Sequence, residues 1–145
     1  MDRIDCGAAS AVFDFAEDGI VDARMTGLVV PANAGTLSGL LLSAGVERGA
    51  AGVLCSVEKA LVALPPIDPK HYGYVPPALR SVPVAVVVHP EQLAVYEQIA
   101  QAAAVSGTIR RAFLSRELAQ EWLRDQARAL AANRVWRPRE NRSSP

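Results

Sequence analysis

The sequence predicts a single α/β domain, with a mixed, mostly parallel sheet of about five strands. The sheet opens with a β-hairpin and is covered by about three to four helices. Two apolar runs, residues 52–57 and 82–88, have the continuous hydrophobic character of strands buried on both faces. They alternate with segments whose apolar residues recur every three to four positions, which is typical of helices. Strands joined through helices need crossover connections, and these favour parallel pairing.

The hairpin is predicted at residues 11–26. Residues 11–15 and 20–26 alternate in character, and Glu17-Asp18-Gly19 between them is a turn signal. Residues 28–30 are expected to extend the second strand. A helix should follow, capped by Asn33 or Thr36. Its predicted buried face consists of Leu37, Leu40, Leu41, Ala44 and Val46.

The second half predicts a strand over 82–88, a helix, a strand over 109–114 and a final helix. Pro90 suits a first helical position because its missing N–H has no intrahelical partner there. Ser115 is expected to cap the last helix. The predicted buried face of the first of these helices consists of Leu93, Tyr96, Ile99, Ala100 and Ala103, and that of the last of Leu118, Ala119, Trp122, Ala129 and Leu130. Residues 60–81 carry five prolines and are expected to be irregular.

Composition narrows the class of protein. The chain has 145 residues with 15 basic and 15 acidic side chains, so no net charge attracts nucleic acid or an anionic membrane. No apolar run reaches the length of a spanning helix, and no secretory signal is visible. Cys6 and Cys55 are interpreted as reduced thiols of a cytoplasmic protein. Residues 1–132 are predicted to form the domain and 133–145 a disordered tail.

No catalytic group, metal site or cofactor site is predicted. His71 and His89 are the two histidines, and neither has a neighbouring ligand at metal-binding spacing. No glycine-rich phosphate loop and no nucleophile elbow around Ser38 or Ser43 is present. Cys55 is interpreted as a small core residue, because a reactive thiol needs an electropositive, open setting.

Arginines gather late in the sequence. Arg110 and Arg111 flank the final strand, and the tail adds Arg134, Arg137, Arg139 and Arg142. A basic patch for phosphate backbones is one interpretation. We favour a solvated edge strand and a soluble tail, because only Trp136 among these arginines offers a stacking surface.

The second half of the chain resembles the STAS-like family, the fold of anti-sigma-factor antagonists and their lipid-binding-protein-like relatives. The resemblance rests on the strand 84–88, the helix through Tyr96, residues 110–119 (RRAFLSRELA) and Trp122-Leu123. It implies the closing strand–helix–strand–helix order of that family. Phosphorylated antagonists carry a serine in an Asp-Ser-Ser-Gly-like turn after the central strand. The matching stretch here, residues 57–66, has no serine, and Ser56 lies nearer the strand. No phosphorylation site is therefore predicted.

The predicted function is a non-enzymatic regulatory or binding module that recognises a protein partner or a small apolar ligand. The candidate binding residues are His71, Tyr72 and Tyr74, in the proline-rich segment 65–80 that the core does not need. Packing of these aromatic residues onto the core is the alternative interpretation. Two other functions stay open: a small enzyme or ligand-modifying protein that uses residues 65–80 as a lid, and a structural subunit of a homodimer.

Overall fold

The architecture is that of a computed structural model, which describes residues 1–16, 18–64, 80–105 and 107–136, with 133–136 described by their backbone alone. The strands are β1 (Asp2–Cys6), β2 (Ala9–Phe15), β3 (Ile20–Val29), β4 (Gly52–Ser56), β5 (Ala60–Val62), β6 (Val84–Val87) and β7 (Arg110–Phe113). The helices are α1 (Pro31–Glu47), α3 (Pro90–Val105) and α4 (Arg116–Trp136).

The described strands form one mixed sheet in the order β1-β2-β3-β4-β6-β7, with β5 paired to β3 beyond the end of β4. The pairs β1–β2 and β2–β3 are antiparallel, and the remaining pairs are parallel. The predicted mixed sheet with an opening hairpin is thus confirmed, but it has seven strands rather than about five. The additional strands are β1 and the three-residue β5.

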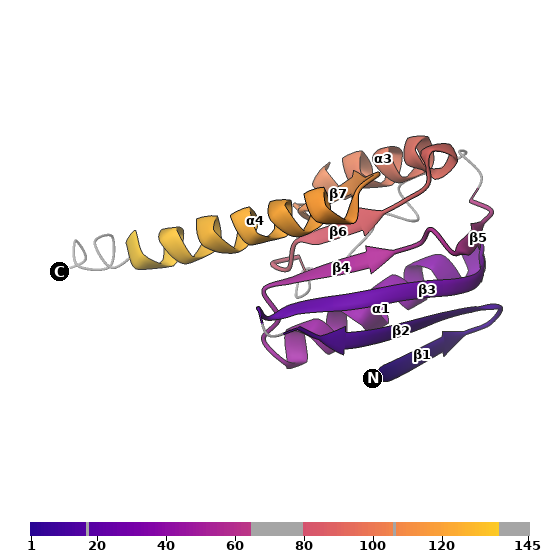
Figure 1. Ribbon diagram of the computed structural model, residues 1–145, viewed down its shortest axis with the longest axis horizontal. Coiled ribbons are helices and arrows are strands. Elements are labelled where there is room, and N and C mark those ends of the chain that lie inside the picture. The colour runs from indigo at the N-terminus through magenta and orange to yellow at the C-terminus, as the bar shows by residue number, and fades with distance from the viewer. Residues whose placement is uncertain (17, 65–79, 106, 137–145) are drawn as a thin grey trace.

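The helices cover the two faces of the sheet unequally (Figure 1). α1 and α3 pack on one face, where Leu37, Leu41 and Ile99 join the larger core. α4 packs on the other face, where Ala119 and Leu123 contact a smaller core around Leu54. All residues of β6 and nearly all of β4 are buried, as predicted for strands covered on both faces.

Helix α1 begins earlier than predicted. Its first residue is Pro31, and Asn33 lies within the first turn rather than at the cap. The buried Asn33 side chain accepts a hydrogen bond from Val30 N (3.0 Å) and donates one to Leu28 O (3.0 Å). It therefore closes the β3–α1 junction from inside the helix. Thr36 is an exposed residue of the same helix.

The predicted face of α1 is partly wrong. Leu37 and Leu41 are buried, but so is Leu42, whereas Leu40 and Val46 are exposed. Apolar residues occupy much of the circumference of this helix, so their spacing alone does not select the face that meets the sheet.

Helix α4 also differs from its predicted face. Ala119 and Leu123 are buried and Trp122 is half-buried, but Leu118 and Ala129 are exposed. The helix lies over the sheet only in its first half and projects beyond it in its second (Figure 1). The predicted cap is confirmed, since Ser115 Oγ accepts a hydrogen bond from Leu118 N at 3.3 Å. The helix continues to Trp136, into the range predicted as a tail.

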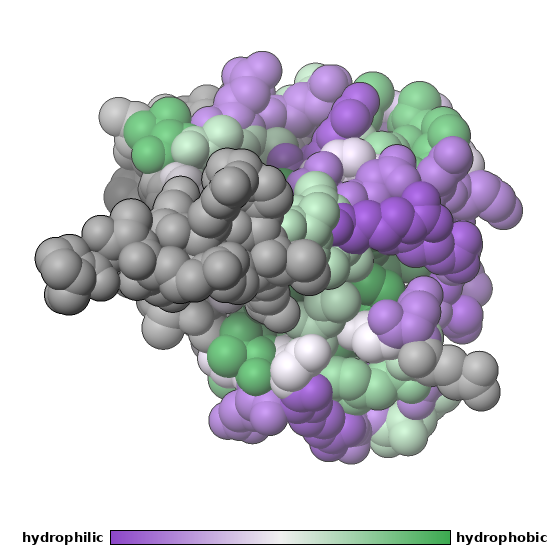
Figure 2. All heavy atoms as spheres, turned by 90° about the vertical axis from the view of Figure 1, so that its left-hand side faces the viewer, coloured by the Kyte–Doolittle hydropathy of each residue, from purple (hydrophilic) through white to green (hydrophobic). Residues whose placement is uncertain are grey.

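The end of the molecule from which α4 projects has both hydrophobic and hydrophilic surface areas. On the part of this face that described residues form, hydrophobic areas are small and separated by hydrophilic side chains (Figure 2). Among the described helices, none is both long and apolar enough to cross a membrane. Cys6 and Cys55 are free thiols, the first half-buried and the second buried.

Candidate functional site

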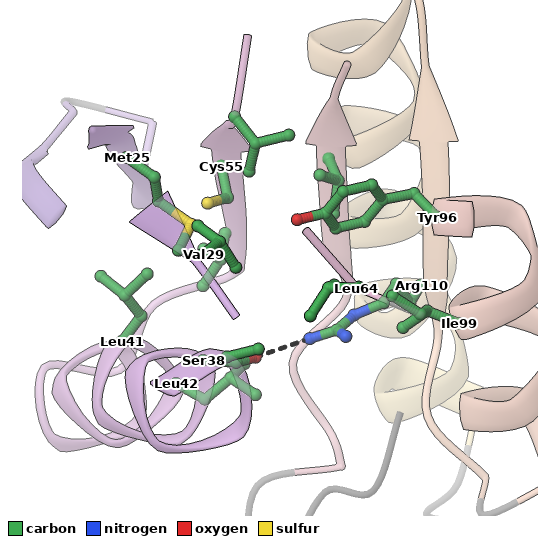
Figure 3. Close-up of a pocket in the computed structure, with 14 residues that line it drawn as sticks. Met25, Val29, Ser38, Leu41, Leu42, Cys55, Leu64, Tyr96, Ile99 and Arg110 are labelled. Carbon is green, nitrogen blue, oxygen red and sulfur yellow. Dashed lines mark hydrogen bonds between the residues drawn. The ribbon is translucent and has the colours of Figure 1, made fainter. Parts of the chain in front are cut away.

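The three predicted binding residues, His71, Tyr72 and Tyr74, lie outside the described residues. The structure therefore neither brings them together nor separates them. A different candidate lies between α1, α3 and the face of the sheet that these helices cover (Figure 3).

This candidate is an apolar cavity of about 50 Å³, within about 550 Å³ of empty space that includes open solvent. Strands β3, β4, β6 and β7 form its floor, and the helices α1 and α3 form its sides. Its apolar lining consists of Met25, Val29, Ala34, Leu41, Leu42, Val53, Val57, Leu64, Val86 and Ile99. Four further lining residues carry polar atoms: Ser38, Cys55, Tyr96 and Arg110. We call this space the α1–α3 cavity.

Arg110 is the one charged side chain among the lining residues that the structure describes. Figure 3 shows its guanidinium reaching from β7 toward Ser38 on α1, whose Oγ accepts a hydrogen bond from Nη2 at 2.8 Å. The Nε atom is buried and has no hydrogen-bond partner. Burial lowers the pKa of the guanidinium, and no described carboxylate pairs with it. Among the described residues this cation thus has no counterion, and it faces an apolar space.

Tyr96 and Cys55 face the same cavity from α3 and β4 (Figure 3). Burial raises the pKa of the Tyr96 hydroxyl above its usual range and that of the Cys55 thiol to about 12. Both groups are therefore protonated near neutral pH, when a thiol cannot act as a nucleophile. Cys55 is a core residue, as its sequence context indicates, and Tyr96 offers a hydroxyl donor.

The sequence interpretation of Arg110 as part of a solvated edge is wrong. Successive side chains of a strand point to opposite faces, so Arg110 shares a face with Ala112. Ala112 packs against the larger core, while Arg111 is exposed. The alternation of side chains along β7 therefore predicts that Arg110 points toward the core. What concealed it was the assumption that arginine at an edge strand faces water.

Catalysis by a metal or a nucleophile would need specific groups among the described residues. No group of three or more potential metal ligands occurs in the part of the chain that the structure describes. His89 is an exposed residue just before α3, and its backbone N donates to Gln92 Oε1 at 2.9 Å. Within the α1–α3 cavity, neither a carboxylate nor an imidazole from the described residues stands beside Cys55 or Ser38 as a base.

Comparisons of the chain with models of protein families, with curated proteins and with solved structures gave no match.

Proposed function

We propose that this domain is a non-enzymatic binding module for a small, mainly apolar molecule that carries one carboxylate. The site is the α1–α3 cavity, and the carboxylate pairs with Arg110. The observation that carries the proposal is the half-buried Arg110, whose guanidinium has Ser38 Oγ as a neutral partner and whose buried Nε has no partner among the described residues.

The energetic argument starts from the cost of burying a charge. A buried cation is retained at a cost of several kcal/mol unless an anion or a full set of acceptors compensates it. The described residues supply one hydroxyl acceptor for a group with five N–H donors. A carboxylate is planar and pairs with two guanidinium N–H groups at once. A bound acid would therefore satisfy what the protein leaves open.

The residues that line the cavity determine the polarity and size of the rest of the ligand. Aliphatic side chains surround the guanidinium, so the rest of the molecule gains from being apolar, at roughly 0.8 kcal/mol for each methylene buried. The cavity volume of about 50 Å³ limits the buried part of the ligand to a few carbon atoms. A longer molecule would extend into the open part of the space. Short-chain carboxylic acids fit these limits.

The described residues bear differently on the other predicted functions. The enzyme alternative depends on residues 65–80 as a lid, and 65–79 lie outside the described residues. The protonated state of Cys55 gives no support to thiol chemistry in this cavity. Recognition of a protein partner and the STAS-like relationship stay predictions.

The experiment is calorimetric titration of the full chain with straight-chain acids from acetate to octanoate. We expect affinity to rise about fourfold with each methylene until the cavity is filled. Butan-1-ol, which has the body of butanoate without its charge, should bind at least about tenfold more weakly. Native mass spectrometry of freshly purified protein would show a ligand retained from the cell.

Two matched variants test the role of the charge. Arg110→Met should remove the preference for butanoate over butan-1-ol, and Ser38→Ala should weaken acid binding less. Arg111→Met, on the exposed face of the same strand, should leave the titration unchanged. Acid binding that is absent in the natural chain, or equal in Arg110→Met, would refute the proposal.

A further inference from the structure

A second and wider pocket lies at the carboxyl end of the parallel strands, on the side where α4 begins. Its volume is about 410 Å³. It is lined by Arg24, Met25, Ser56, Glu58, Lys59, His89 and Arg116. We call it the strand-end pocket. It shares Met25 with the α1–α3 cavity.

The fold creates this pocket where β4 stops and β3 continues. Arg24 is paired with Ser56 at the end of β4, and Gly27 pairs with Ala60 at the start of β5. Residues 57–59, which connect β4 to β5, leave the sheet and then return to it. Gln92 holds this excursion in place, because its Nε2 donates to Val57 O and Ala60 O at 3.3 Å each. The segments that follow the carboxyl ends of β4, β6 and β7 meet at this edge of the sheet, so their side chains line one pocket.

The charges in the strand-end pocket are unbalanced. Arg24, Lys59 and Arg116 are basic, and Glu58 is the single acidic residue of the described lining. Arg116 is paired with Asp22 of β3 and lies 3.5 Å from Ser56 Oγ. Arg24 and Lys59 are exposed, and neither forms an ion pair with another described residue. With Arg116 neutralised by Asp22, Arg24 and Lys59 exceed Glu58 by one positive charge, and this local excess favours an anion.

We propose that the strand-end pocket binds a small phosphorylated polyol or sugar. The phosphate lies between Arg24 and Lys59, and Arg116, positioned by Asp22, faces the same charge. Glu58 would repel a purely anionic ligand, but it accepts hydrogen bonds from hydroxyl groups, as does Ser56. His89 is the one aromatic side chain of the described lining, so a nucleobase would have a single imidazole to stack on. A hydroxyl-rich body with one phosphate therefore fits better than a nucleotide.

This inference is independent of the acid-binding function of the α1–α3 cavity. The two sites use different cations, Arg110 in one and Arg24 with Lys59 in the other. A chain that fails to bind short acids can still bind a sugar phosphate, and the reverse also holds.

The test is titration of the full chain at low ionic strength with glucose 6-phosphate, glucose, inorganic phosphate and AMP. Glucose 6-phosphate should bind most tightly, because it alone combines the phosphate with a polyhydroxylated ring and no base. Raising the salt concentration should weaken its binding, since both cations are exposed to solvent.

Variants identify the residues responsible. The double substitution Arg24→Gln and Lys59→Gln should weaken glucose 6-phosphate binding at least about tenfold. Glu58→Gln should tighten the binding of inorganic phosphate and reduce the preference for the sugar. Arg128→Gln, an exposed residue of α4 paired with Asp125, is the control and should change neither. All four side chains are on the surface or half-buried, so thermal unfolding should confirm that the variants fold.

Three results would overturn the inference. AMP binding more tightly than glucose 6-phosphate would point to a nucleotide. Equal affinity for inorganic phosphate and glucose 6-phosphate would show that the hydroxyl groups are not recognised. Unchanged glucose 6-phosphate binding in the double variant would place the anion elsewhere.

Discussion

At Arg110, the proposed binding role and the stability of the domain favour different residues. Its guanidinium lines a mainly apolar cavity, and its buried Nε atom has no hydrogen-bond partner among the described residues. Replacing such a group with an apolar residue of similar length removes the cost of desolvating a charge. A residue that lowers the stability of its own domain is expected where binding requires it.

We therefore expect Arg110→Met to raise the free energy of unfolding, by about 1–3 kcal/mol, while it removes acid binding. Urea unfolding followed by circular dichroism measures the change. Arg111→Met serves as the control, because this exposed residue lies with its guanidinium 5.3 Å from the Phe113 ring and outside the core. It should alter stability by no more than about 0.5 kcal/mol. A marked loss of stability in Arg110→Met would show that the arginine is a structural group.

Cys55 should resist alkylation while the domain is folded. Its pKa of about 12 leaves the thiol protonated at pH 8, and the fraction of reactive thiolate rises only as the pH approaches that value. The half-buried Cys6 provides the internal comparison. Mass spectrometry after brief iodoacetamide treatment at pH 8 should show one label, on Cys6. Treatment in denaturant should show two. Rapid labelling of Cys55 in the folded chain would mean that the α1–α3 cavity opens to solvent.

At the scale of elements, α4 is held to the sheet by a few contacts near its start. Leu123 is fully buried and packs over Gly52, where an added Cβ would lie 3.0 Å from Leu123 Cδ2. Trp122 is half-buried, and its ring lies 5.5 Å from that of Phe113 at a tilt of 51°. The glycine lets the helix approach the sheet closely, so the smaller leucine contributes the better-packed contact.

Leu123→Ala is accordingly expected to destabilise the domain more than Trp122→Ala. The first should cost about 2–5 kcal/mol, as for a fully buried leucine. The second should cost about 1–2 kcal/mol, because the indole is partly exposed to water and its removal leaves a smaller enclosed cavity. Chemical unfolding of both variants measures the difference. The reverse order would show that the indole, rather than the contact at Gly52, anchors α4.

Sequence patterns predicted the elements whose physical signals are strongest. The β-branched run of β6 is buried on both faces, and Ser115 caps α4. β1 was missed because Asp2, Arg3 and Asp5 give it the polarity of a loop, which an edge strand can have. β5 was missed because it has three residues and pairs with β3 far along the strand.

For the candidate site, the sequence showed the residues but not their neighbours. Tyr96 and Ile99 follow from the helical period of α3, and both are buried in the larger core. Arg110 and Ser38 are 72 residues apart in the chain, and their contact depends on how β7 and α1 pack together. The periodicity of a short segment contains no information on such a contact. The period of two in β7 could, however, have shown that the Arg110 side chain points toward the core.

At the scale of the whole molecule, the sheet is asymmetric. Its parallel half, β4 with β6, is covered on both faces, whereas the face of the antiparallel half that α4 does not reach carries polar side chains. Antiparallel sheets tolerate water on one face, and parallel sheets rarely do. The two candidate sites both lie in the parallel half, where strand ends and covering helices create concave surfaces.

The free edge of β1 has a consequence for the behaviour of the protein at high concentration. Asp5 accepts hydrogen bonds from Arg3 Nε at 2.8 Å and from Ser10 Oγ at 2.7 Å, and all three residues face solvent. Exposed pairs of this kind add little to folding stability. Their charges instead discourage a strand of a second molecule from adding to the edge. Replacing Arg3 and Asp5 together by threonine should leave the melting temperature nearly unchanged but increase self-association in sedimentation velocity. These surface charges thus contribute to colloidal solubility rather than to the fold, and a variant that stayed monodisperse would show that β1 is protected in another way.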